Sequence, residues 1–293
     1  MNNDRLLYRR GILQLVASGF FLSTAGIALR LVEQADGWQI LFYRSFALSV
    51  TILLILVFQK RSRFFDEFRG LGWNDCLLAV FLGTGFVAYV FALLYNTVAN
   101  ALFIFSCAPF LAGFLGWILL GERVATRTWL AIGVAMSGLA VMVGSELAVS
   151  RYLGTLLALW IPIAYAASII AVRRSKRDNM LVALCLAGLV AGCLSAFFVT
   201  DYALTPRDLI ISLYLGVFQV GVGFTLVVLG SRYVPAAQVG LLALVEPVLA
   251  PIWAWMGVGE VPGLATIVGG TIIFLAIGTD GILNIKSSES NSA

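Results

Sequence analysis

The sequence predicts an all-α integral membrane protein with ten transmembrane helices, arranged as two inverted five-helix repeats with both termini in the cytoplasm. Three observations predict this fold class: the composition, ten long apolar segments, and a set of residues repeated 138 positions apart. Of the 293 residues, 61% are hydrophobic and only 12% are charged, whereas soluble domains have about 45–50% and about 25%. A chain this apolar cannot cover its surface with polar groups. A soluble enzyme, a nucleic-acid-binding protein and a disordered protein are therefore excluded.

Ten apolar segments are long enough to cross a bilayer, whose hydrocarbon core requires about 20 residues of helix. In chain order they are residues 11–32, 38–58, 74–95, 98–120, 127–145, 152–172, 180–200, 208–230, 236–257 and 263–284. Very short links, such as Asn96-Thr97 between the third and fourth segments, predict antiparallel neighbours. The first segment is too long for the apolar part of a signal peptide and lacks a clear cleavage site, so we interpret it as a retained helix.

The basic residues predict the orientation in the membrane. If the amino terminus is cytoplasmic, fifteen of the 19 Lys and Arg residues lie on the cytoplasmic side and three lie outside, while Arg44 lies within a segment. This asymmetry follows the positive-inside rule, so both termini are expected in the cytoplasm. Residues 286–293 are polar and predict a disordered cytoplasmic tail.

An internal repeat divides the chain into residues 1–145 and residues 146–285. The matching residues are of types that are uncommon enough to make chance agreement implausible: Gly83 and Gly221, Phe86 and Phe224, Tyr95 and Tyr233, Pro109 and Pro247, Trp117 and Trp255, Gly121 and Gly259, Glu122 and Glu260. Because five is an odd number of crossings, the second copy begins on the opposite side of the membrane and is inverted. Inverted repeats are typical of secondary transporters.

The repeated pattern resembles a known group of transporters. Pro109 is followed by Gly121-Glu122 in the first half, Glu246-Pro247 by Gly259-Glu260 in the second, and Arg44 lies in the second segment. This pattern is similar to that of the drug/metabolite transporter superfamily, and within it the EamA-type branch. The resemblance implies a central cavity surrounded by the first, third, fourth, sixth, eighth and ninth helices. It also implies export of amino acids (aromatic ones included), drugs or other metabolites from the bacterial cytoplasm. The carboxylate of Glu246 is not duplicated in the first half.

Two of the charged residues within the predicted membrane segments, Glu246 and Arg44, are candidates for a functional role. Glu246 lies about ten residues into the ninth segment, where a carboxylate costs about 2.5–3.5 kcal/mol and is not expected to face lipid. It either binds a substrate ammonium, exchanges a proton, or stabilises the bundle by pairing with Arg44. Arg44 lies near the outer end of the second segment. It either extends to the headgroups, pairs with a buried carboxylate, or contacts a substrate carboxylate.

Further candidates for the cavity lining are aromatic and amide side chains: Phe86, Tyr89, Asn100, Trp160, Tyr165 and Gln238. The aromatic residues suit an apolar or aromatic substrate, although Trp and Tyr also mark membrane interfaces. The two amides occupy matching repeat positions, where they either bind substrate or, for Asn100, cap a helix.

Three prolines and two glutamates have a predicted structural role. Pro109, Pro247 and Pro251 lie within predicted helices and are expected to bend them. Glu122 and Glu260 each lie just before a helix, and we interpret both as favouring the amino terminus of the helix that follows.

The sequence has no histidine and no nucleotide-binding or metalloprotease motif, so we expect no cofactor, no bound metal and no nucleic-acid partner. We therefore predict a non-enzymatic secondary transporter in the cell inner membrane, which acts on a small-molecule substrate within the lipid bilayer. It exports small amphipathic metabolites by alternating access, with neutral or aromatic amino acids as the first expectation. The alternatives are an exporter of drugs or other metabolites, a passive channel, and a membrane-embedded enzyme acting on lipid-linked substrates.

Overall fold

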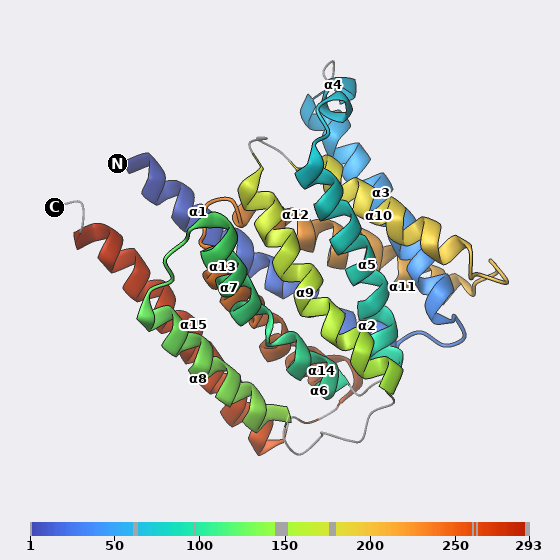
Figure 1. Ribbon diagram of the computed structural model, residues 1–293. Coiled ribbons are helices and arrows are strands. Elements are labelled where there is room, and N and C mark those ends of the chain that lie inside the picture. The colour runs from blue at the N-terminus through green and yellow to red at the C-terminus, as the bar shows by residue number, and fades with distance from the viewer. Residues whose placement is uncertain are drawn as a thin grey trace.

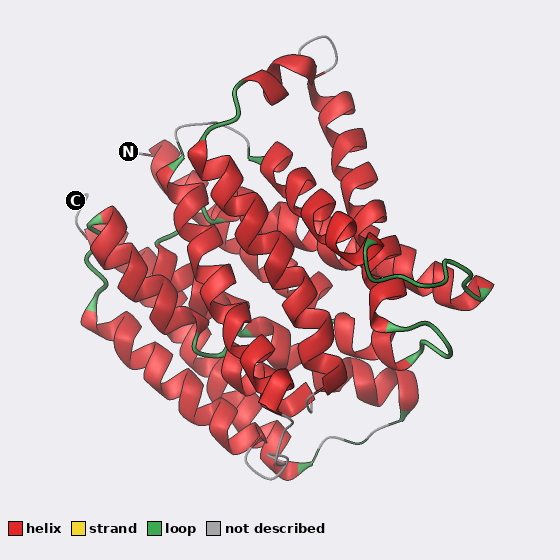
Figure 2. Ribbon diagram, turned by 45° about the vertical axis from the view of Figure 1, so that its right-hand side comes forward, coloured by secondary structure: helices red, strands yellow, loops and turns green. Residues whose placement is uncertain are grey.

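The computed structural model describes residues 2–60, 64–95, 98–143, 152–175, 180–259, 261 and 263–290. Within this part of the chain every regular element is a helix (Figure 2). Up to residue 143 the helices are α1 (Asn2–Leu22), α2 (Ala25–Arg30), α3 (Gly37–Lys60), α4 (Phe64–Arg69), α5 (Trp73–Tyr95), α6 (Val98–Phe105), α7 (Ala108–Leu120) and α8 (Thr126–Val143). From residue 152 they are α9 (Tyr152–Arg174), α10 (Leu181–Ala196), α11 (Pro206–Tyr214), a π-helical segment (Leu215–Val222), α12 (Gly223–Gly230), α13 (Ala236–Ala243), α14 (Val245–Val258) and α15 (Leu264–Ser290).

Eight helical stretches of the described chain are long and apolar enough to cross a membrane. Two shorter apolar helices, Thr126–Met142 and Leu181–Ala196, overlap the expected segments 127–145 and 180–200. Over the described residues the structure therefore confirms a helical fold with several candidate membrane spans, whereas ten crossings and the orientation of the termini stay predictions.

The long helices pack into one bundle through closely approaching backbones. α5 packs against α9, α10 packs against both α3 and α5, and α8 pairs with α15 along one edge (Figure 1). Small residues allow these approaches, as is usual between membrane helices. A Cβ atom added to Gly138 of α8 would lie 2.8 Å from the carbonyl oxygen of Gly269 in α15, so this pair requires glycine.

The two ends of the bundle are held by different contacts. Both termini lie at one end (Figure 1), where α1 packs so closely on the α12–α13 turn that a Cβ on Gly11 would lie 2.9 Å from Val234 Cγ2. At the other end the buried carboxylate of Asp208 accepts hydrogen bonds from three successive backbone N–H groups, those of residues 33–35, at 2.9, 3.0 and 3.1 Å. The loop between α2 and α3 is thereby fixed to the start of α11.

Three of the membrane helices are interrupted and a fourth changes its winding. The breaks lie at residues 23–24, between α1 and α2, at residues 106–107, between α6 and α7, and at Leu244, between α13 and α14. The π-helical segment Leu215–Val222 joins α11 to α12.

The three prolines that were expected to bend helices lie shortly after two of these breaks. Pro109 and Pro247 occupy the first turns of α7 and α14, where a missing N–H leaves no helical hydrogen bond unmade. Each of these two prolines lies two or three residues after a break in the helix. Pro251 lies inside α14.

The carboxyl-terminal helix is longer than the sequence predicts. α15 continues to Ser290, although a disordered tail is expected from residue 286. The helix has no glycine or proline after Gly281 to end it. The last three residues lie outside the described part of the chain, as does Glu260.

Candidate functional site: a buried cavity at the helix interruptions

A cavity lies in the middle of the bundle, at the points where the helices are interrupted. It is lined by Leu22, Arg44, Leu82, Gly85, Phe86, Tyr89, Phe105, Ile161, Ala164, Tyr165, Gln219, Phe224, Ala243 and Glu246. Leu22, Phe105 and Ala243 are the last residues of α1, α6 and α13, and Gln219 belongs to the π-helical segment. Irregular backbone within a membrane is tolerated where it is buried in protein or lines a cavity, and in transporters it surrounds the substrate site.

Glu246 reaches this cavity from the first turn of α14 and is only 7% exposed. The hydroxyl of Tyr89, on α5, donates a hydrogen bond of 2.8 Å to Glu246 Oε1. A hydrogen bond to an ionised group is stronger than one between neutral groups, so Tyr89 both holds and orients the carboxylate.

Arg44 reaches the same cavity from α3 and is 3% exposed. Its guanidinium carbon lies 5.5 Å from the centre of the Phe86 ring, a cation–π arrangement. Arg44 also interacts electrostatically with Glu246 and Tyr89. Gly216 makes this placement possible, because any Cβ there would collide with the backbone carbonyl of Arg44.

Aromatic rings form much of the remaining wall. The ring of Phe224 meets that of Phe86 edge-on at 4.9 Å, and the ring of Phe105 meets that of Tyr165 edge-on at 5.5 Å. Such edge-to-face pairs fix the positions of the rings beyond what burial alone would do. The wall around the Glu246 carboxylate and the Arg44 guanidinium is therefore mostly apolar.

Gln219 is a cavity residue that the sequence analysis missed. Its side chain is 2% exposed, and its Nε2 makes a long hydrogen bond of 3.4 Å to the Leu22 carbonyl. Its Oε1 is buried without a hydrogen-bond partner among the described residues. An amide inside an otherwise apolar segment was the available signal. A buried acceptor left unpaired is costly and requires an explanation.

Other predicted cavity residues lie elsewhere. Trp160 donates from Nε1 to Thr84 Oγ1 at 3.0 Å and is outside the cavity lining. Gln238 accepts a hydrogen bond from the Tyr8 hydroxyl at 2.9 Å and donates one to Asp280 Oδ2 at 3.3 Å, in a separate polar cluster. The side chain of Asn100, in α6, lies outside the part that the structure describes.

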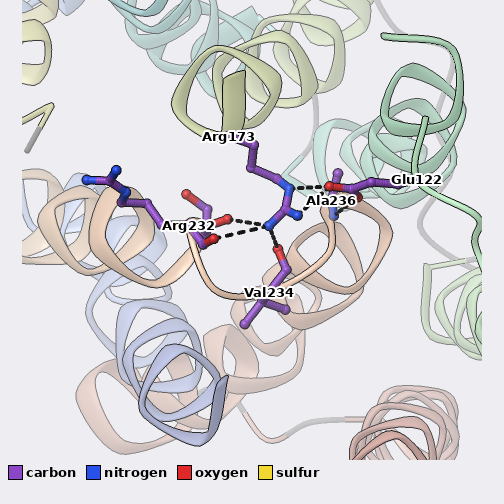
Figure 3. A network of polar contacts seen from close by, with 6 residues as sticks. Glu122, Arg173, Arg232, Val234 and Ala236 are labelled. Carbon is purple, nitrogen blue, oxygen red and sulfur yellow. Dashed lines mark hydrogen bonds and ion pairs between the residues drawn. The ribbon is translucent and has the colours of Figure 1, made fainter. Parts of the chain in front are cut away.

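Glu122 forms a second polar network, together with Arg173 and the α12–α13 turn (Figure 3). It pairs with Arg173, at the end of α9, and its Oε2 accepts a hydrogen bond of 3.0 Å from the backbone N–H of Ala236. Glu122 therefore caps α13, a helix distant in sequence, whereas the sequence analysis paired it with the helix that follows it. Helix rotation and packing decide this partner, and neither is visible in residue spacing.

The lining of the central cavity contains one guanidinium and one carboxyl group, which have opposite binding preferences. A guanidinium presents several fixed N–H donors to a carboxylate. A buried carboxylate can in turn accept hydrogen bonds from an ammonium group. Both interactions are strengthened in an apolar, low-dielectric surrounding.

Comparison with known proteins agrees with this architecture. The chain is 27% identical, over 271 residues, to an uncharacterized transporter from Archaeoglobus fulgidus, covering 92% of this chain and 95% of that protein. A solved crystal structure of a protein superimposes with a TM-score of 0.74 at 19% identity, covering 97% of this chain and 98% of that one. The model of the EamA-like transporter family matches twice, over residues 9–144 and 152–279. With nearly its whole length matched, the chain belongs to the EamA-like transporter family.

Proposed function

We propose that this transporter exports small zwitterionic metabolites, amino acids first, across the bacterial inner membrane by alternating access. The observation that carries the proposal is that Arg44 and Glu246 both line one buried, partly aromatic cavity. Arg44 binds the α-carboxylate and Glu246 the α-ammonium of the substrate. The export direction rests on the resemblance of the repeated motif to that of amino-acid and metabolite exporters.

The proposed topology has ten crossings in two inverted repeats, residues 1–145 and 146–285, with both termini cytoplasmic. The two family matches, over residues 9–144 and 152–279, support a division near residue 145. The eight long apolar helical stretches and the two shorter apolar helices support the number of crossings. The fifteen-to-three distribution of basic residues supports the orientation.

The remaining cavity residues contact different parts of the substrate in this proposal. Tyr89 holds the Glu246 carboxylate, and Gln219 offers its unpaired carbonyl oxygen as a second acceptor for the ammonium. Phe86 and Tyr165 contact the substrate side chain, so neutral amino acids with apolar or aromatic side chains fit best. Binding of a zwitterion leaves the net charge of the cavity unchanged, which avoids burying an unpaired charge.

Counterflow in proteoliposomes tests this proposal. Vesicles are preloaded with phenylalanine, with its amide, which lacks the carboxylate, or with 3-phenylpropionate, which lacks the ammonium, and entry of labelled phenylalanine is followed. Wild type is expected to exchange only the zwitterion. The loss of one hydrogen-bonded charge contact, about 1.5–3 kcal/mol, corresponds to a reduction of about 10- to 150-fold for each analogue.

Charge-removing variants identify the group that each residue binds. We expect Arg44→Gln to weaken discrimination against the amide, and Glu246→Gln to weaken discrimination against the acid. Arg207→Gln is the control, because Arg207 pairs with Glu33 at an exposed site outside the cavity. Opposite changes in preference cannot result from misfolding. The zwitterion assignment is wrong if folded wild type exchanges the amide or the acid as well as the amino acid.

A further inference from the structure

The network around Glu122 and Arg173 connects three helices, two of which line the central cavity. Glu122 follows the end of α7, Arg173 lies in the last turn of α9, and Ala236 begins α13. α7 packs against both α9 and α13. Further along two of these helices, Tyr165 in the middle of α9 and Ala243 at the end of α13 line the cavity.

Arg173 makes contacts in several directions at once. Its Nε and Nη2 face Glu122 Oε1, while its Nη1 donates to the backbone carbonyls of Ser231, at 3.0 Å, and Val234. A longer contact of 3.5 Å goes to the carbonyl of Arg232, whose side chain points away from the network (Figure 3). The α12–α13 turn is thus fixed by one planar guanidinium, whose fork-like donors can serve several acceptors.

A second, smaller cavity lies between this network and the central cavity. It shares Leu82, Tyr165 and Phe224 with the central cavity. It continues past Ser168 to Ser231, whose carbonyl accepts a hydrogen bond from Arg173. The two voids are therefore adjacent, and the smaller one reaches the network at Ser231.

We propose that Glu122 and Arg173 form a latch that closes the substrate pathway at the α12–α13 turn and must separate when the cavity opens there. Both side chains are mostly buried, at 17% and 18% exposure, so their pairing is less weakened by water than a surface ion pair. Opening releases the amino-terminal end of α13, and this helix transmits the movement to Ala243, its last residue, at the cavity wall. The latch thus acts on the wall of the cavity that binds substrate. This inference rests on the alternating access proposed above.

Side-specific thiol labelling tests the latch without requiring a substrate. Ser168, 4% exposed and lining the smaller cavity, becomes a reporter as Ser168→Cys after the four native cysteines are replaced. A membrane-impermeant thiol reagent is then applied to each membrane face separately. In the parent we expect slow labelling. In Glu122→Gln and Arg173→Gln we expect the reporter to be labelled about 10- to 100-fold faster than in the parent when the reagent is applied to the membrane face nearest Glu122 and Arg173. Removing one partner of a buried ion pair strongly weakens the closed state.

Two further variants separate a latch from a general structural role. Arg173→Lys keeps the charge but loses the planar fork, so we expect a labelling rate between those of the parent and Arg173→Gln. Arg207→Gln breaks the exposed pair with Glu33 at the other end of the bundle, and the rate of the reporter should not change. Thermal stability of each purified variant is measured in parallel, since general loosening would increase labelling from both faces.

The outcomes distinguish the latch from the proposed substrate. Faster labelling from one face together with no amino-acid exchange by wild type would support the latch and overturn the substrate assignment. Unchanged labelling in folded Glu122→Gln and Arg173→Lys proteins would overturn the latch, whatever the exchange assay gives. Equal acceleration from both faces would also overturn it.

Discussion

Replacing Gln219 by leucine should make the protein more stable and a poorer transporter. The Oε1 of Gln219 is buried without a hydrogen-bond partner among the described residues, and its Nε2 has only a 3.4 Å contact to the Leu22 carbonyl. An unsatisfied buried polar atom costs about 1–3 kcal/mol, whereas a long hydrogen bond contributes less than an ordinary one, which gives about 1 kcal/mol. Leucine removes the unpaired acceptor at similar size. The expected net gain is therefore about 1 kcal/mol, or a melting temperature higher by about 2–4 °C.

The transport defect has the opposite sign and a larger size. If the free carbonyl oxygen accepts a hydrogen bond from the substrate ammonium, its removal costs about 1.5–3 kcal/mol of binding, so the KM for counterflow should rise about 10- to 150-fold. Gln238 provides the matched control for stability, because its amide is hydrogen-bonded to both Tyr8 and Asp280. Gln238→Leu should lower the melting temperature by leaving both partners without this bond. A lower melting temperature for Gln219→Leu, or a higher one with an unchanged KM, would refute the reasoning.

Two other substitutions have matched controls within the chain. Tyr89→Phe removes the hydroxyl that orients Glu246, so the KM for counterflow should rise by about tenfold or more. Its control is Tyr43→Phe, which loses a hydrogen bond of 2.7 Å to a loop carbonyl outside the cavity and should leave the KM unchanged. Gly240→Ala would place a Cβ 2.6 Å from the Cα of Pro109, and overpacking of about 1–3 kcal/mol should lower the melting temperature in a thermal-shift assay; Gly133→Ala, with open space around it, should leave that temperature unchanged or raise it.

The class of fold could be predicted from the sequence because it depends on composition and segment length. An apolar run of about 20 residues forms a helix in a membrane whatever its neighbours are, since the backbone must satisfy its own hydrogen bonds there. The lengths of individual helices were less predictable: segment 180–200 contains a helix of only 16 residues, Leu181–Ala196. The breaks before Pro109 and Pro247 were expected as bends.

The site was predictable one residue at a time but not as an arrangement. Arg44 and Glu246 stand out in sequence because charges are costly within a membrane. Their partners do not, because a helix that is apolar on every side carries no pattern that fixes which face turns inward. Trp160 was therefore expected in the cavity but bonds to Thr84, and Gln219, on the π-helical segment, was missed.

The packing of α1 also affects how the chain is made. Gly11 is in close contact with Val234, which lies more than two hundred residues later in the chain. At a synthesis rate of about 5–20 residues per second, Val234 is added about 11–45 s after Gly11. During that interval α1 lacks the packing partners that it has in the finished bundle. The hydroxyl groups of Ser18 in α1, and of Ser23 and Thr24 just after it, donate hydrogen bonds to carbonyls three residues earlier, at 2.6–2.7 Å. This segment thus satisfies these hydroxyl groups with its own carbonyls before its later partners in the bundle have been made.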